Sequence, residues 1–233
     1  MKKILILITL LLTLSSSTFA QEASNNQKMP TRFQSVPMDK AQLLQTGKGK
    51  MFCPSCGMTL PLFYKTNHAV ESNGTVKQYC SIHCLATNIH KHNLKDVKVV
   101  DNTSLKFIDA NSAWYVVGST KAGTMSRISK YAFATKKDAQ SFAKKFSGEV
   151  KTFEETLKFV QENLAKAQKM IAKKQAMMAK KGEMMFGKIC KPTEKTFDSV
   201  AEAKSYLKTE EICGKIKGKK LQAIALYLTS RSK

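Results

Sequence analysis

Acidic side chains are scarce in this sequence: 17 Asp and Glu stand against 39 Lys and Arg, which gives a formal net charge of +22. Such an excess commonly indicates a nucleic acid or an anionic lipid surface as partner. The basic residues are spread along the whole chain, with no arginine cluster and no interleaved aromatic residues. We therefore predict no nucleic-acid partner. We favour a solvated lysine-rich surface over weak contact with an acidic partner or an anionic membrane surface.

Several motifs of known chemistry are also missing. No Cys-x-x-Cys-His sequence occurs, which excludes covalent haem attachment by that motif. No phosphate-binding loop, paired carboxylates or Ser-His-acid set stands out, and these absences argue against kinases and hydrolases. Beyond the first twenty residues no stretch is apolar enough to cross a bilayer. We therefore predict a binding protein and no enzyme.

The N-terminus has the three parts of a secretory signal peptide. Two lysines form a basic start, residues 4–14 are apolar, and Thr18 and Ala20 stand where a signal peptidase reads small residues. No cysteine lies near that site, so the sequence offers no lipid anchor there. We predict that residues 1–20 are removed on export and that the mature protein is periplasmic.

The pattern after residue 20 predicts a lead-in followed by an α+β domain. Residues 21–50 are polar and without periodicity, which is typical of a flexible segment. Residues 51–151 alternate short apolar runs with turn sequences, and we predict two tandem β-β-α-β units. The predicted strands are 60–64, 75–79 and 97–100, then 105–109, 114–117 and 149–150, with helices over 82–92 and 135–146.

A long basic helix is predicted over residues 152–182. Thr152 and Glu155 form a capping box at its start. Apolar residues then recur every three or four positions along one narrow stripe: Phe153, Leu157, Val160, Leu164, Ala167 and Ile171. Such a stripe packs on the preceding domain or pairs with another chain, so the oligomeric state stays open. Gly182 is predicted to end the helix.

Residues 183–233 are predicted to form a small helical module. Residues 182–190 and 221–228 faintly resemble the first and last helices of a small cytochrome c, and we interpret the module as a haem-less remnant. Cys190 and Cys213 are predicted to close it with a disulfide. Five nearby methionines are candidate copper(I) ligands, although core packing is the commoner role of methionine. They are Met170, Met177, Met178, Met184 and Met185.

The other four cysteines form two closely spaced pairs that indicate a metal site. Cys53 and Cys56 flank a turn, where a C-x2-C spacing puts two sulfurs on one side of a small loop and Gly57 permits the tight backbone. Cys80 and Cys84 are four residues apart, so they share one face of a predicted helix start, where thiolates are favoured. A β-hairpin between the pairs can bring all four sulfurs together.

The ligand types leave the metal between copper(I) and zinc. Four thiolates suit zinc in a closed structural site. Met58 follows the first pair directly, and a thioether beside thiolates favours copper(I). His83, His68 and Met125 are further candidate ligands, although a lone histidine is more often a surface residue.

A thiol-disulfide oxidoreductase is the main competing hypothesis, because Cys-Pro-Ser-Cys resembles an exchange motif. That motif normally opens a long helix, whereas here Gly57 and Pro61 follow at once. No proline occurs between Pro61 and Pro192, so the distant cis-proline of thioredoxin-like sites is missing. Structural disulfides within the pairs, and a zinc knuckle that serves structure or protein interaction, are the other interpretations.

Several segments of residues 50–155 together resemble one known family. They are Cys53-Pro-Ser-Cys-Gly-Met58, Tyr79-Cys-Ser-Ile-His-Cys84, Phe107-Ile-Asp-Ala110, Trp114-Tyr-Val-Val117, Gly118-Ser119, Met125 and Ala132-Phe-Ala134. In this combination they are similar to NosL, the accessory lipoprotein of nitrous oxide reductase. The resemblance implies two β-β-α-β units, related in fold to organomercurial lyase, and copper(I) as the metal. It puts Cys53, Cys56 and Met58 on the family motif and Met125 on a methionine of the second unit.

The resemblance also implies a role. NosL proteins are held to supply copper(I) for the copper centres of nitrous oxide reductase. This implies a metallochaperone whose partner is that enzyme, another copper enzyme or a membrane copper-delivery protein. The family's lipoprotein cysteine is absent here, Cys80 and Cys84 make the site richer in sulfur, and residues 150–233 lie outside the family core.

Overall fold

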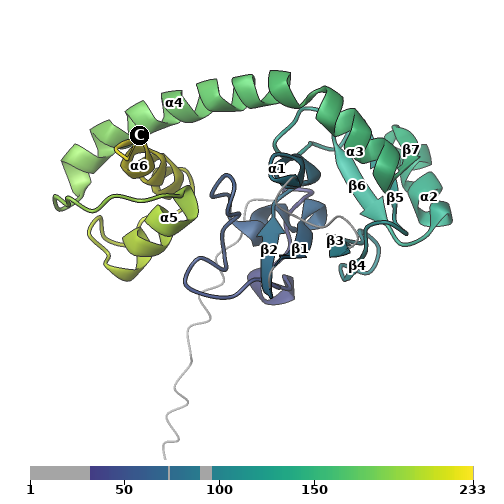
Figure 1. The fold of residues 1–233 in the computed structure, drawn as a ribbon, viewed down its shortest axis with the longest axis horizontal. Helices are drawn as coiled ribbons and strands as arrows, with labels where there is room; N and C mark the ends of the chain where they lie inside the picture. The colour runs from purple at the N-terminus through teal and green to yellow at the C-terminus, as the bar shows by residue number, and fades with distance from the viewer. Residues whose placement is uncertain (1–31, 73, 90–95, 233) are drawn as a thin grey trace, which may run out of the picture.

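The computed structural model describes residues 32–72, 74–89 and 96–232. The predicted signal peptide, the first part of the predicted lead-in and the end of the predicted helix over 82–92 lie outside these residues. Figure 1 shows two small sheets, a long helix that extends away from them, and two shorter helices beneath its far end. Strands and helices are mixed in the first half of the chain, which confirms the predicted α+β class.

The first sheet is antiparallel and has the strand order β2-β1-β3-β4. Its strands in chain order are β1 His68–Ser72, β2 Thr75–Tyr79, β3 Val97–Val100 and β4 Phe107–Asp109. β1 and β2 form a hairpin with His68 opposite Tyr79. Helix α1, Ile82–Ala86, follows β2 and begins where predicted, because the Ser81 hydroxyl accepts a hydrogen bond from the Cys84 N–H. It ends at Ala86, well before the predicted end at residue 92.

The second sheet repeats this plan with the strand order β6-β5-β7. Its strands are β5 Trp114–Val117, β6 Lys130–Phe133 and β7 Glu149–Thr152, and helix α2 Lys136–Phe146 lies between β6 and β7 in the chain. Asp101 and Asn102 join the two sheets: Asn102 N–H donates to Ala132 O, and the Asp101 carboxylate accepts from Ala134 N–H. Two β-β-α-β units are therefore present, β1-β2-α1-β3 and β5-β6-α2-β7.

Two predicted strands were wrong in type or length, and two strands, β1 and β6, were not predicted. Residues 60–64 belong to a 3-10 helix, Leu60–Thr66, because Pro61 suits a first helical turn and lacks the N–H that a strand ladder needs. The strand predicted over 105–109 is shorter, Phe107–Asp109, and lies at the edge of the first sheet beside β3. Strand β6 was missed, since all four of its residues are buried and it shows no alternation of polar and apolar side chains.

The described part of the predicted flexible lead-in packs against the domain. Val36 is buried in a small core with Tyr64 and Val100. Gln45 accepts a hydrogen bond from Gln78 N–H and donates one to the Phe52 carbonyl. A buried side-chain amide whose oxygen and nitrogen are both hydrogen-bonded holds its segment in place. The polar composition of this region therefore does not make it flexible.

The predicted long helix consists of α3, Phe153–Glu162, and α4, Leu164–Ile189. The predicted capping box opens α3, and Asn163 interrupts the helix with φ −100° and ψ 2°. The predicted end at Gly182 was wrong: Gly182 lies inside α4, and a Cβ on it would overlap the Ala223 carbonyl of α6. The glycine thus permits a close helix crossing. No helix in the described ranges is long and apolar enough to span a membrane.

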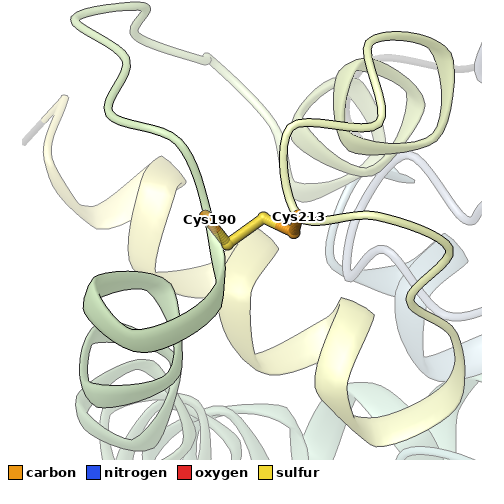
Figure 2. The surroundings of a disulfide bond; sticks show 2 residues. All are labelled: Cys190 and Cys213. Atoms are coloured by element: carbon orange, nitrogen blue, oxygen red, sulfur yellow. A yellow bond between two sulfur atoms is a disulfide. The ribbon is translucent and has the colours of Figure 1, made fainter.

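The C-terminal module, which we define as residues 183–232, has its own apolar core. It contains α5, Val200–Thr209, and α6, Gly218–Ser230. The predicted disulfide between Cys190 and Cys213 is confirmed and ties the end of α4 to the loop before α6 (Figure 2). Figure 1 shows α4 as a long, curved helix that runs from the end of α3 to the side of α5 and α6.

Candidate metal centre

The first cysteine pair lies on a tight loop, residues 52–59, which we call the cysteine loop. The Cys53 N–H donates to the Met58 carbonyl at 2.8 Å, and the Gly57 N–H donates to the Cys53 carbonyl at 2.8 Å. An isolated β-bridge joins the two ends of the loop. Gly57 has φ +71°, a conformation that residues with a side chain rarely adopt. The sequence predicted this turn correctly.

The second pair lies where β2 passes into α1. Cys80 follows the strand, and its carbonyl accepts a hydrogen bond from the Thr66 hydroxyl at 2.8 Å. Cys84 is in the first turn of α1, whose start is fixed by the Ser81 cap. The strand end and the capped helix together place the sulfurs of Cys80 and Cys84 beside those of the cysteine loop.

The structure brings all four predicted cysteines together. Their sulfurs lie within 4.8 Å of one another, and none of the four side chains is more than 3% exposed. Cys80 Sγ lies 3.5 Å from Cys56 Sγ and 3.7 Å from Cys84 Sγ. A tetrahedron of metal–sulfur bonds of about 2.3 Å puts its sulfurs about 3.8 Å apart. The four free thiols therefore fit one soft metal ion, and none forms a structural disulfide.

Hydrogen bonds among the thiols lower the pKa of one cysteine and raise the pKa of two others. Burial raises the pKa of Cys53, but hydrogen bonds from Cys56, Cys80 and Cys84 outweigh it and hold that pKa well below its usual value. The pKa values of Cys80 and Cys84 are raised well above theirs, first by their hydrogen bonds to Cys53 and Cys56 and then by burial. The cluster thus stabilises a thiolate at Cys53, and a bound metal cation would displace the remaining thiol protons.

The other predicted ligands lie close to this part of the core. Met58 and Met125 are half-buried and pack against the apolar cluster that includes the cysteines. His83 is buried on α1, and its Nε2 has no hydrogen-bond partner among the described residues. It is not one of the residues whose ligand atoms gather at the centre. The ligand roles of Met58, Met125 and His83 stay predictions.

His68, also considered from the sequence, is a core residue. Its Nδ1 lies 3.1 Å from the Thr66 carbonyl and its Nε2 lies 3.0 Å from the Tyr115 hydroxyl. Burial lowers the pKa of His68 to about 4. Both ring nitrogens are engaged, so this side chain stays neutral and is not available to a metal.

The methionines of α4 are distributed along the helix. Met170, Met177 and Met184 are exposed at seven-residue intervals, which is about 10 Å along a helix. Met185 packs against the core of the C-terminal module. Because thioethers that share an ion must lie within a few ångströms of each other, these three exposed methionines form no single binding site.

Two residues of the C-terminal module contact the site and were not predicted. Lys204 Nζ donates to the Gly57 carbonyl, and Gln222 Nε2 donates to the Cys56 carbonyl at 3.2 Å. Burial lowers the pKa of Lys204 to about 8, although attraction by Cys56, Cys53 and Cys80 opposes this. A sequence signal existed for Lys204, because it stands in line with buried Ala201 and Leu207 on one face of α5.

These features define a class: a metal-binding protein of two β-β-α-β units, with a buried cluster of four thiols between a loop and a short helix. The chain belongs to the NosL family, whose model matches residues 45–161, half of the chain and all four clustered cysteines. This confirms the family predicted from the sequence, and it agrees with an accessory protein rather than an enzyme. We call residues 45–161 the NosL domain.

Among solved structures, the chain is similar to the crystal structure of the copper chaperone NosL from Shewanella denitrificans. The two are 27% identical, and the match covers 51% of this chain and 96% of the other, with a TM-score of 0.39. A comparison with curated proteins found no match.

Proposed function

We propose that this protein binds copper(I) at Cys53, Cys56, Cys80 and Cys84 and delivers it to a copper protein. The observation that carries the proposal is the cluster of four buried free thiols within 4.8 Å, in a chain of the NosL family. Soft thiolate ligands select copper(I) over harder ions. Burial protects the four thiols from oxidation.

The proposed recipient is nitrous oxide reductase, and the proposed compartment is the periplasm. The recipient follows from the family resemblance of the sequence. Two features support the compartment: the signal-peptide pattern of residues 1–20, and the Cys190–Cys213 disulfide, a bond typical of oxidising compartments. Surface lysines such as Lys166 and Lys173 on α4 are exposed and would favour a recipient with an acidic docking face.

Zinc is the second candidate cargo. A closed, tetrahedral set of four thiolates is the usual donor set of a structural zinc site. Disulfide exchange is disfavoured by burial, since a thiol that attacks a protein disulfide must be accessible and Cys53 is fully buried.

The deciding experiment is metal binding by the mature protein, purified without oxygen and offered copper(I) or zinc. We expect about one copper(I) per chain to be retained against a strong copper(I) chelator. The variant Cys53→Ser/Cys56→Ser should retain almost none. The matched variant Cys190→Ser/Cys213→Ser, which changes the same number of cysteines outside the cluster, should bind as the wild type does.

Two outcomes would overturn the proposal. Unchanged copper stoichiometry in Cys53→Ser/Cys56→Ser would move the site elsewhere. Zinc that is held tightly and does not exchange for copper(I) would make the cluster a structural centre. The single variants Met58→Leu, Met125→Leu and His83→Gln then show whether any of these side chains adds a ligand, by a change in copper(I) affinity.

The recipient is tested separately. Copper(I)-loaded protein, mixed without oxygen with metal-free nitrous oxide reductase, should transfer its copper to that enzyme. Transfer to another copper protein, with none to nitrous oxide reductase, would keep the chaperone and replace its partner.

A further inference from the structure

The C-terminal module lies directly on the cysteine loop. Phe52 packs into the core of the module with Phe197 and Ala201, whereas its neighbour Cys53 belongs to the core of the NosL domain. Two consecutive residues of one loop are therefore buried in different parts of the protein. The loop that carries half of the metal site is shared between them.

Two polar side chains of the module form hydrogen bonds to the backbone of this loop. Lys204 and Gln222 donate hydrogen bonds to the carbonyls of Gly57 and Cys56. Val200 approaches Gly57 so closely that a Cβ at that glycine would overlap the Val200 side chain. The module thus covers the loop backbone at Cys56 and Gly57.

Lys204 brings a buried positive charge to this contact. It is 2% exposed, and its Nζ also lies 4.9 Å from the centre of the Phe52 ring. Among the described residues no carboxylate forms an ion pair with it. Metal binding removes the thiol protons, so four thiolates around copper(I) or zinc carry a net negative charge. The loaded cluster therefore supplies the opposite charge that a buried ammonium needs.

The contact between module and loop is incompletely packed. A cleft of 440 Å³ lies along it, lined by Phe52 and Pro54 on one side and by Ser205 and Tyr206 on the other. Gly182 is the only buried residue of α4, the helix that links the two regions. A surface that contains a cleft and is tethered by a largely solvated helix can separate, and the separation withdraws Phe52 from the core of the module.

We propose that the C-terminal module is a cover of the metal site, which Lys204 holds on the loaded cluster and which must lift from the cysteine loop for metal to pass. The inference rests on the proposed metal-binding function and adds to it a control of metal release. Metal binding and docking of the cover are then linked, so each strengthens the other by the same factor. A recipient protein gains the metal by displacing the module from the same backbone carbonyls.

The cover is tested first in the metal-free protein. The variant Val200→Glu puts a carboxylate against the loop, and we expect its clustered thiols to react with a maleimide at least tenfold faster than those of the wild type. Lys208→Glu, on the exposed face of the same helix, is the matched control and should react at the wild-type rate. Equal rates in Val200→Glu and Lys208→Glu, with the Cys190–Cys213 disulfide intact, would overturn the cover.

A milder variant tests the cover in case Val200→Glu misfolds. Gln222→Ala removes one hydrogen bond to the loop and should speed thiol labelling severalfold. If Val200→Glu unfolds the module, the rate in Gln222→Ala decides, and a wild-type rate there overturns the cover.

The role of Lys204 is tested in the loaded protein by metal release to a chelator. Lys204→Met keeps the length of the side chain without its charge, and we expect release at least tenfold faster with unchanged stoichiometry. Lys188→Met, which removes an exposed lysine of α4, is the control and should release at the wild-type rate. Release rates within twofold of each other in the two variants would overturn the role of Lys204.

The two proposals fail in different ways. A wild-type protein that holds no copper(I) contradicts the proposed function, and the labelling rates of the metal-free variants still decide whether the module covers the thiols. The release test then uses the zinc-loaded protein.

Discussion

The NosL domain and the C-terminal module use cysteine in opposite ways. In the NosL domain four buried cysteines remain thiols with neighbouring sulfurs 3.5 Å and 3.7 Å apart, well beyond a covalent S–S bond. In the module Cys190 and Cys213 form a disulfide. Two cysteines within bonding distance can form a disulfide, as Cys190 and Cys213 do. Four sulfurs spaced around a common centre fit the geometry of a bound metal ion.

Metal should stabilise the first region through its thiols, and most of this gain should remain when the disulfide of the second region is removed. A ligand that binds only the folded state, at a thousand times its Kd, adds about 4 kcal/mol to the free energy of unfolding. We expect calorimetry to show this gain in the wild type and in Cys190→Ser/Cys213→Ser. The same gain in Cys53→Ser/Cys56→Ser would remove the contrast between the regions.

Acid should weaken the NosL domain through His68. Its pKa is about 4 when folded and about 6.5 when unfolded, so the unfolded chain binds the proton more tightly. The stability is complete above pH 6.5 and is lost as the pH falls toward 4, by about 3 kcal/mol. Urea unfolding at pH 7 and pH 4.5 should show a smaller pH effect in His68→Gln than in the wild type. Equal pH effects in both proteins would show that protonation of His68 does not lower the free energy of unfolding.

Removing the disulfide should weaken the module alone. The chain closed between Cys190 and Cys213 spans 23 residues, and its loss should cost about 3 kcal/mol by the entropy of the unfolded loop. Hydrogen exchange should become faster in α5 and α6 of Cys190→Ser/Cys213→Ser and stay unchanged in β1, β3 and β5. Faster exchange throughout the NosL domain would mean that the two regions unfold as one unit.

The smallest effect distinguishes two glycines of α4. A side chain at Gly182 overlaps Ala223, whereas Gly187 has no atom within 4 Å of an added Cβ. Gly182→Ala should destabilise the protein by about 2 kcal/mol through overpacking. Gly187→Ala should stabilise it by up to about 1 kcal/mol, because alanine favours a helix. Thermal unfolding measures both, and a stabilised Gly182→Ala would mean that α4 and α6 separate easily.

Local interactions were predictable from the sequence. Ser81, Thr135 and Thr152 each cap a helix that begins within one residue of its predicted start, because a cap bonds backbone groups two or three residues away. The C-x2-C turn with Gly57 is equally local. Strand β6, by contrast, was invisible, since its identity depends on the neighbours that bury both of its faces.

The position of Gly182 shows the same limit in a helix. On propensity a glycine among lysines and methionines predicts a helix end. The structure continues the helix, because α6 crosses at that point and gains from the missing side chain. Close packing between distant segments therefore outweighed a local preference of about 1 kcal/mol.

By itself the sequence determined which atoms are available: two pairs of soft ligands at fixed spacing, one separate pair for a disulfide, and caps that begin the helices. These depend on neighbours within a few residues. Only the tertiary structure decided that the four sulfurs meet in one buried place and that Lys204 reaches Gly57 across 147 residues of chain. Contacts over such separations follow from how whole elements bury their apolar faces, and no short stretch of sequence contains that information.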